Sequence, residues 1–234
     1  MELMKKAVFA LALALGAAPA ARAQEGPGTR SSTDYEAGGD GTESRNTGFG
    51  LKGGYNLASI EGANAGLFTN RDNLKDFHAG IYAQYGFTNF ASLMVELLYS
   101  RKGFQSNFPG TTAQNIRLDY IELPLLFVAN LTETLSIHVG PQVALLNNVN
   151  EGGATVALAA NGYNTLDYGG IAGAEARIGI AKLGARFDWS LGKVYKDGAT
   201  VRYSTGTGTT SVALADNNIR NQVFQVYLGL GFKH

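Results

Sequence analysis

The stretch that decides the fold is FHAGIYAQYGF, residues 77–87, which is followed after a short break by a second run from Ala91 to Lys102. In the first run, Phe77, Ala79, Ile81, Ala83, Tyr85 and Phe87 alternate with His78, Gly80, Tyr82, Gln84 and Gly86. In the second, Leu93, Val95, Leu97 and Tyr99 alternate with Ser92, Met94, Glu96, Ser100 and Lys102. A period of two is typical of a β-strand whose two faces meet different surroundings, so the two runs predict a hairpin.

The same alternation recurs along the rest of the chain. Besides the hairpin, it predicts strands at residues 47–58, 118–129, 134–146, 168–178, 182–191 and 222–233. The segment 168–178 fits least well, because its presumed outer face is mostly Gly and Ala. Pro124 stands in mid-strand and lacks the N–H that a ladder uses, so we expect a local bulge at residues 123–125.

The predicted connections are alternately long and short. The long ones cover residues 59–76, 103–117, 147–167 and 192–221, and the short ones 88–90, 130–133 and 179–181. Long loops at one end and tight turns at the other are typical of barrels that cross an outer membrane. The fold class that we predict is all-β, an eight-stranded antiparallel up-and-down transmembrane β-barrel. Val201 and Tyr203 are able to pair with Val212 and Leu214, which leaves open either a hairpin above the membrane or ten strands.

The N-terminal segment predicts export. Lys5 and Lys6 precede an apolar stretch at residues 7–18, and Ala21-Arg22-Ala23 has the small-x-small form of a cleavage site, so residues 1–23 are predicted to be a signal peptide. Its apolar stretch is shorter than the roughly 20 residues of a membrane-spanning helix. Residues 24–46 are poor in large apolar side chains, which predicts a flexible periplasmic leader before a barrel at 47–234.

Composition excludes several kinds of function. The formal net charge is +0 and there is no Cys, so the sequence favours neither a nucleic-acid partner nor a disulfide or a thiolate metal site. Thirty-one Gly with five Pro, 11 Tyr and 12 Phe suit many strands and turns. We also expect a girdle of aromatic side chains at the membrane interfaces, formed by Tyr55, Phe77, Phe87, Phe90, Tyr99, Phe104, Tyr120, Phe127, Trp189, Tyr195 and Phe232.

Charged residues fall on the face opposite the apolar one, which is the inner face of the predicted barrel. They are Lys52, Glu96, Glu122, Glu175, Arg177, Arg186 and Asp188. Buried charges must be paired, since unpaired burial costs several kcal/mol per ion. We favour a structural network of ion pairs in the lumen, because an eight-stranded barrel is just wide enough for side chains to fill. The alternative is a charged conduction path or gate.

Ser136, His138 and Glu122 offer the residue types of a nucleophile, a base and an orienting carboxylate. Alternation alone places Ser136 beside His138, and there is no nucleophile-elbow motif, so we predict no catalytic residues and a neutral, hydrogen-bonded His138. Acidic residues in or next to the loops match no EF-hand spacing, and we predict no metal site and no cofactor; they are Asp72, Asp76, Asp197 and Asp216.

Several motifs carry a family resemblance: GFGLKGGYNLA (48–58), the hairpin leading into ELLYSRKGF (96–104), YIELP (120–124), VGPQVALL (139–146) and VYLGLGFK (226–233). With them the chain resembles the outer-membrane β-barrel domain family of porin-like and PorT-like small barrels, similar in shape to OmpX and the OmpA barrel. The resemblance implies an outer-membrane location and no particular activity.

From the resemblance we expect a non-enzymatic integral outer-membrane protein, with extracellular long loops for envelope structure or interaction and periplasmic termini. Its expected partners are outer-membrane lipid and lipopolysaccharide, the barrel assembly machinery, and an extracellular or envelope protein. Two alternatives in the membrane are a narrow or gated pore for small solutes and, less favoured, a lipid hydrolase. A soluble ligand-binding barrel is the remaining alternative.

Overall fold

The computed structural model describes residues 46–62, 65, 69–107, 114–158, 162–205, 208–213 and 218–232. The predicted signal peptide and nearly all of the predicted leader lie outside these residues. Within them, no helix has the length and apolar character needed to cross a membrane.

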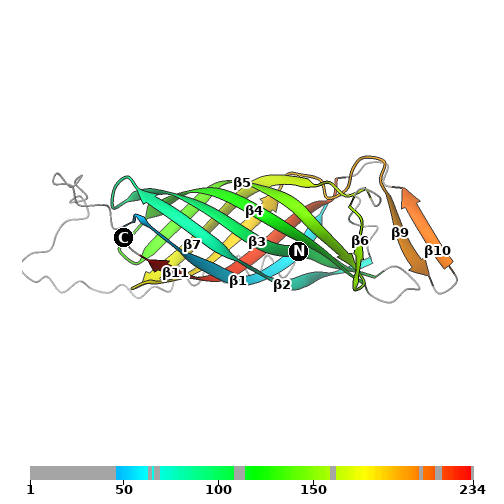
Figure 1. Cartoon of the computed structure of the whole chain (residues 1–234), viewed down its shortest axis with the longest axis horizontal. Helices are drawn as coiled ribbons and strands as arrows, with labels where there is room; N and C mark the ends of the chain where they lie inside the picture. The colour runs from blue at the N-terminus through cyan, green and yellow to red at the C-terminus, as the bar shows by residue number, and fades with distance from the viewer. Residues whose placement is uncertain are drawn as a thin grey trace, which may run out of the picture. The chain divides into compact units, whose positions relative to one another are not determined.

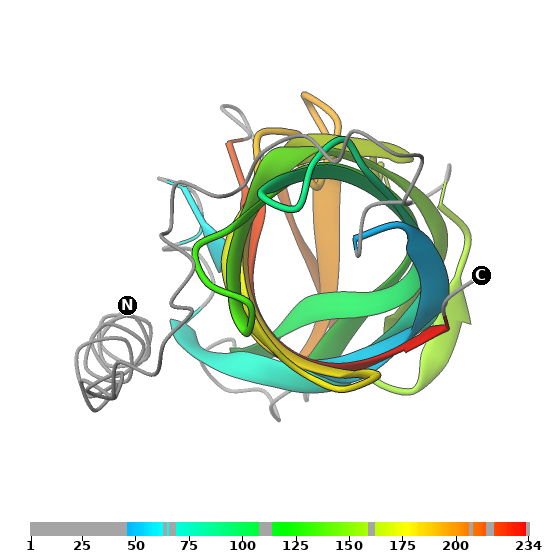
Figure 2. The same cartoon turned by 90° about the vertical axis from the view of Figure 1, so that its left-hand side faces the viewer.

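Eight antiparallel strands form a closed barrel, which Figure 2 shows end-on. They are β1 (Gly48–Glu61), β2 (Thr69–Gly86), β3 (Ala91–Asn107), β4 (Gln114–Asn130), β5 (Leu135–Glu151), β7 (Leu166–Ile178), β8 (Ala181–Ser190) and β11 (Arg220–Phe232). Each strand pairs with the one before it in this order, and β11 pairs with β1 to close the ring. The prediction of an eight-stranded up-and-down barrel is confirmed.

Three further strands lie in the connections. β6 (Ala154–Val156) pairs with the end of β5, while β9 (Thr200–Thr205) and β10 (Gly208–Ala213) form a two-stranded sheet of their own. The pairing of Val201 with Val212 is as predicted, but Tyr203 lies opposite Thr210 and not Leu214. Since β9 and β10 do not join the barrel sheet, the ten-stranded alternative is wrong.

The strands present apolar side chains outward and bury the alternate ones inside the barrel. Outward positions such as Leu51, Ile81 and Leu228 are about half exposed, whereas their neighbours in the alternation are buried. The strand that fitted least well obeys the same rule, because Tyr168 of β7 faces outward and Ile171 is buried. An apolar outer face around a closed sheet is the surface that suits a lipid environment.

Four barrel strands extend at least four residues beyond their predicted bounds: β2 and β4 begin earlier, and β3 and β5 end later. The long connections therefore shrink to residues 62–68, 108–113, 152–165 and 191–219. In the added segments the outward positions become polar, as in Lys75, Gln105, Asn115 and Arg117. The ladder continues there, with Gly103 opposite Arg117 and Gln105 opposite Asn115, so the apolar pattern ends before the strands do.

The bulge expected at Pro124 is absent. Pro124 lies opposite Gln142 of β5. Beyond it the register is unchanged on both sides of β4: Leu125 pairs with Val95 of β3, and Phe127 pairs with Val139 of β5. The missing N–H thus interrupts the ladder locally without an inserted residue. The register shift between β4 and β5 lies at Asp119/Tyr120 instead.

The barrel has two unlike ends, which lie at opposite sides of Figure 1. The short-turn end carries connections 87–90, 131–134 and 179–180, together with the start of β1 and the end of β11, where Phe49 pairs with Phe232. The long-loop end carries the four longer connections. Gly179 in the two-residue turn has φ 62°, a left-handed conformation that glycine adopts without strain.

Candidate functional site in the barrel interior

The middle of the barrel holds a buried ion group around Glu96 of β3. The Lys52 ammonium of β1 donates to Glu96 Oε1, and Arg186 Nη1 of β8 donates to Glu96 Oε2 at 2.6 Å. Arg186 Nε donates to Gln225 Oε1 at 2.5 Å. All four side chains are buried, so one carboxylate faces two cations away from water.

A second ion group surrounds Lys102 of β3. Its Nζ lies 2.7 Å from Glu122 Oε1 and 2.5 Å from Asp188 Oδ2, and Gln142 donates to Asp188 Oδ1. Two carboxylates therefore share one ammonium group. Glu122 Oε2 has no hydrogen-bond partner among the described residues.

A third group lies around Glu175 of β7. Lys182 Nζ is 3.2 Å from Glu175 Oε1 and donates to Gln84 Oε1 at 2.7 Å, while the Tyr227 hydroxyl donates to Glu175 Oε2 at 3.0 Å. The Tyr227 ring joins this group to the first, because Lys52 Nζ lies 4.1 Å from its centroid. A Cβ at Gly184 would lie 2.3 Å from that ring, so the close approach requires glycine.

The structure places the predicted charged set as follows. Lys52, Glu96, Glu122, Glu175, Arg186 and Asp188 are buried in the interior. Arg177 instead lies at the short-turn rim, partly exposed, and donates to Asn46 Oδ1 at 3.3 Å. Lys102 and Lys182 are absent from the predicted set although the alternation places both on the inner face. The role of the set stays a prediction.

An apolar cluster, here called the long-loop plug, fills the other end of the interior. It combines the loop residues Tyr163, Val194, Tyr195 and Ala199 with Phe104, Ile116, Leu118, Tyr120, Leu146, Val149 and Ile219 of the strands and their ends. The Tyr163 and Tyr195 rings pack with their centroids 4.7 Å apart. Asn164 Nδ2 holds the loops together by donating to the carbonyls of Lys193 and Tyr195, at 2.8 and 2.9 Å.

The plug corrects one expectation about aromatic residues. Phe104, Tyr120 and Tyr195 are buried inside and do not belong to an outer girdle. The exposed rings that do face outward include Tyr55, Phe77, Phe87, Phe90, Phe127 and Phe232. Sequence reasoning missed the plug because the alternation is reversed there: the inward positions, such as Phe104, Ile116 and Leu118, are apolar and the outward ones between them are polar.

Burial raises the pKa of the Tyr163 hydroxyl, and the neighbouring Tyr195 and Glu151 raise it further. The hydroxyl donates to Glu151 Oε1 at 2.5 Å. Burial also raises the pKa of Tyr195. Both groups are therefore neutral hydrogen-bonding tyrosines at ordinary pH.

The residues considered for hydrolysis do not assemble into a catalytic set. Ser136 Oγ donates to the backbone carbonyl of Glu175 at 3.5 Å, and Glu122 pairs with Lys102. Neither ring nitrogen of the buried His138 has a hydrogen-bond partner in the described part of the chain, so no protein group there supplies the predicted hydrogen bond. Across the same residues, no cluster of three or more His, Asp or Glu side chains could hold a metal ion.

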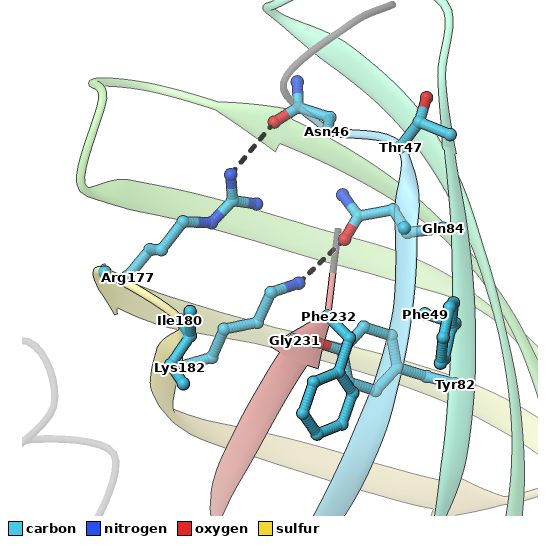
Figure 3. Close-up of a pocket in the computed structure, with 12 residues that line it drawn as sticks. Asn46, Thr47, Phe49, Tyr82, Gln84, Arg177, Ile180, Lys182, Gly231 and Phe232 are labelled. Atoms are coloured by element: carbon cyan, nitrogen blue, oxygen red, sulfur yellow. Dashed lines mark hydrogen bonds between the residues drawn. The ribbon is translucent and has the colours of Figure 1, made fainter. Parts of the chain in front are cut away.

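A pocket of about 150 Å³, here called the rim pocket, opens at the short-turn end (Figure 3). Its lining includes the polar side chains of Asn46, Tyr82, Gln84, Arg177 and Lys182. Asn46 fixes one wall, because its Nδ2 donates to the carbonyls of residues 88 and 89 in the β2–β3 turn while its Oδ1 accepts from Arg177.

The geometry of a closed barrel with an apolar outer face agrees with a comparison against protein families. The model described as "Outer membrane protein beta-barrel domain" matches residues 23–196, well over half of the chain. The chain belongs to this family. It is an integral β-barrel protein of the outer membrane, and the resemblance inferred from the sequence is confirmed.

Solved structures of low sequence identity share the fold. Neisserial surface protein A matches with a TM-score of 0.51 at 16% identity, over 80% of this chain and 98% of that one. Ail of Yersinia pestis (10% identity, 80% and 99% covered, TM-score 0.44) and OprG from Pseudomonas aeruginosa (12%, 82% and 99%, 0.43) are more distant. The first match supports the fold alone. A comparison with curated proteins gives no match.

Proposed function

We propose that this protein is a non-enzymatic outer-membrane barrel with a closed lumen, whose long loops serve envelope structure or interaction. The observation that carries the proposal is the filled interior. Three ion groups occupy the interior from its middle to the short-turn end, and the long-loop plug occupies the other end. An eight-stranded barrel has room for little more than these side chains.

The ion groups support a structural role because their charges are matched across the barrel. Glu96 of β3 pairs with cations on β1 and β8, and Lys102 of β3 pairs with carboxylates on β4 and β8. The pairs of β3 with β1 and β8 join strands that are not neighbours in the sheet, and the pair of β3 with β4 joins two neighbouring strands. Such pairs offset the cost of removing the charges from water only while both partners are present.

The unlike ends of the barrel support an orientation. Long loops in outer-membrane barrels face outward and short turns face the periplasm, so the short-turn end with both termini of the barrel is proposed to be periplasmic. The loops would then meet lipopolysaccharide and an extracellular or envelope protein partner. The barrel assembly machinery is the proposed partner during insertion.

Cysteine labelling tests the orientation, since the chain has no Cys of its own. Asp197 lies exposed in a long connection and Glu133 lies exposed in a short turn. With a membrane-impermeant maleimide on intact cells, the Asp197→Cys variant should be labelled, and the Glu133→Cys variant only after the outer membrane is permeabilised. The reverse pattern would overturn the orientation.

A narrow or gated pore is the second candidate. It is favoured by the column of charged side chains and by polar atoms without hydrogen-bond partners among the described residues, at Glu122 and His138. Water molecules beside these atoms would give the lumen a hydrated path. The pore predicts single-channel conductance in a planar bilayer, and the closed barrel predicts none.

A further inference from the structure

The rim pocket joins the interior of the barrel to its lipid-facing surface. Tyr82, Gln84 and Lys182 belong to the inner face, whereas Phe49, Ile180 and Phe232 face outward and are 48%, 65% and 44% exposed. Between the two sets the lining is Gly48, Gly179 and Gly231, which place no side chain across the rim. The pocket therefore takes polar side chains from the inner face of the barrel and apolar ones from its outer face, and Figure 3 draws both sets.

The polar side of the pocket carries excess positive charge. Arg177 has no carboxylate within 4 Å among the described residues, and its guanidinium donates to the neutral Asn46 amide. Lys182 pairs with Glu175, donates to Gln84 and lies with its Nζ 4.7 Å from the centroid of the Tyr82 ring. Two cations thus face one carboxylate, and an anionic group would complete the site.

A buried hydroxyl gives an independent indication of a ligand. Tyr82 is only 4% exposed, lines the pocket, and its hydroxyl has no hydrogen-bond partner in the described part of the chain. A buried polar atom left without a partner costs about 1–3 kcal/mol. A Cβ at Gly231 would lie 2.9 Å from this hydroxyl, so glycine keeps open the space that a ligand oxygen would use.

We propose that the rim pocket binds the phosphate of a phospholipid at the short-turn rim of the barrel. Arg177, Lys182 and the Tyr82 hydroxyl donate to the phosphate oxygens, and the acyl chains run over Phe49, Ile180 and Phe232. A small soluble anion would fill the polar side alone and leave the adjoining apolar surface unused. The assignment to the periplasmic leaflet rests on the proposed orientation, whereas the binding itself does not.

The test uses the full chain extracted in a non-ionic detergent and titrated with short-chain phosphatidylglycerol by isothermal calorimetry. We expect one saturable site per chain. Arg177→Gln should weaken binding roughly tenfold, the loss of one hydrogen bond between charged groups. Tyr82→Phe, which removes only the hydroxyl, should weaken it severalfold, and Gly231→Ala should weaken it without altering any charge.

The matched control is Arg117→Gln, a partly exposed arginine at the long-loop end, which should bind like the parent. Unchanged binding by Arg177→Gln, or an equal loss in Arg117→Gln, would overturn the site. Inorganic phosphate or a short-chain diacylglycerol that binds as tightly as the lipid would overturn the assignment to a phospholipid. Titration of the unmutated chain with phosphatidylglycerol, inorganic phosphate and diacylglycerol tests the proposal without relying on the folding of any variant. The reverse pattern in the cysteine-labelling experiment would overturn the proposed orientation and leave the binding site unaffected.

Discussion

Glu96 is the residue on which the interior charge balance depends most directly. It is fully buried and pairs with both Lys52 and Arg186. Neither cation has another carboxylate within ion-pair distance among the described residues. Loss of the Glu96 charge therefore leaves two buried cations without a counter-charge.

We expect Glu96→Gln to lower the free energy of unfolding by about 3–5 kcal/mol, the usual cost of breaking a buried pair. Urea unfolding in lipid vesicles, followed by the fluorescence of the single Trp, measures the change. The control is Asp197→Asn, which breaks an exposed pair with Lys193 and should cost less than about 1 kcal/mol. Equal losses in the two variants would contradict a structural role for the ion group.

The raised pKa of Tyr163 leads us to expect that the stability of the folded chain depends on pH. Its pKa is raised in the folded chain, so above about pH 10 the unfolded chain loses this proton while the folded chain keeps it. The free energy of unfolding should consequently fall as the pH rises above 10. Tyr163→Phe removes this one contribution, and its unfolding should depend less on pH by up to about 1.4 kcal/mol per pH unit.

Urea midpoints of the parent and of Tyr163→Phe, compared at pH 8 and pH 11, check this expectation. Between pH 8 and pH 11 the urea midpoint of the parent should fall further than the midpoint of Tyr163→Phe. A difference between the two midpoints that stays constant would mean that Tyr163 ionises equally in both states and is not buried by the plug.

The interior also shows what single residues in a sequence can predict. Alternation places Lys102 and Lys182 on the inner face as reliably as Lys52 and Arg186. It does not reveal that Lys102 lies between Glu122 and Asp188, because the first contact depends on the register of β3 against β4 and the second joins β3 to β8, far apart in the chain. The plug escapes prediction for a different reason: beyond the lipid-facing part of the strands the apolar side chains point inward and the polar ones outward, which reverses the pattern used to assign the faces.

Strand β4 shows where the membrane imposes a pattern and where it does not. From Ile121 to Phe127 its outward side chains are apolar and exposed, but Asn115 and Arg117 on the same face are polar. Lipid requires an apolar outer face, whereas water accepts either kind of side chain. The sequence therefore predicts the strand within the bilayer and misses its extension beyond it.

This difference predicts the result of placing a charge along β4. Leu123→Arg should lower the stability in lipid vesicles by about 2–4 kcal/mol, because Leu123 faces the hydrocarbon. Asn115→Arg lies on the same face of the same strand, at its long-loop end, and should have little effect. The fraction of each variant that folds into vesicles measures the difference, and similar losses would place the lipid boundary elsewhere.

At the scale of the whole molecule, the barrel interior changes in character from one end to the other. The rim pocket lies at the short-turn end and shares Lys182 and Gln84 with the third ion group, the other two ion groups lie in the middle, and the plug lies at the long-loop end. The rim pocket has space for a ligand, while the ion groups and the plug fill the path behind it with side chains. The account thus combines binding at the rim with a lumen that does not conduct.

The most direct test of this account is single-channel recording of the purified full chain in a planar lipid bilayer. A gel shift between unheated and heated samples first shows that the inserted protein is a folded barrel. The account predicts no reproducible conductance steps for the parent chain. Reproducible steps whose size changes in Arg186→Gln or Glu122→Gln would contradict it and show that the lumen conducts.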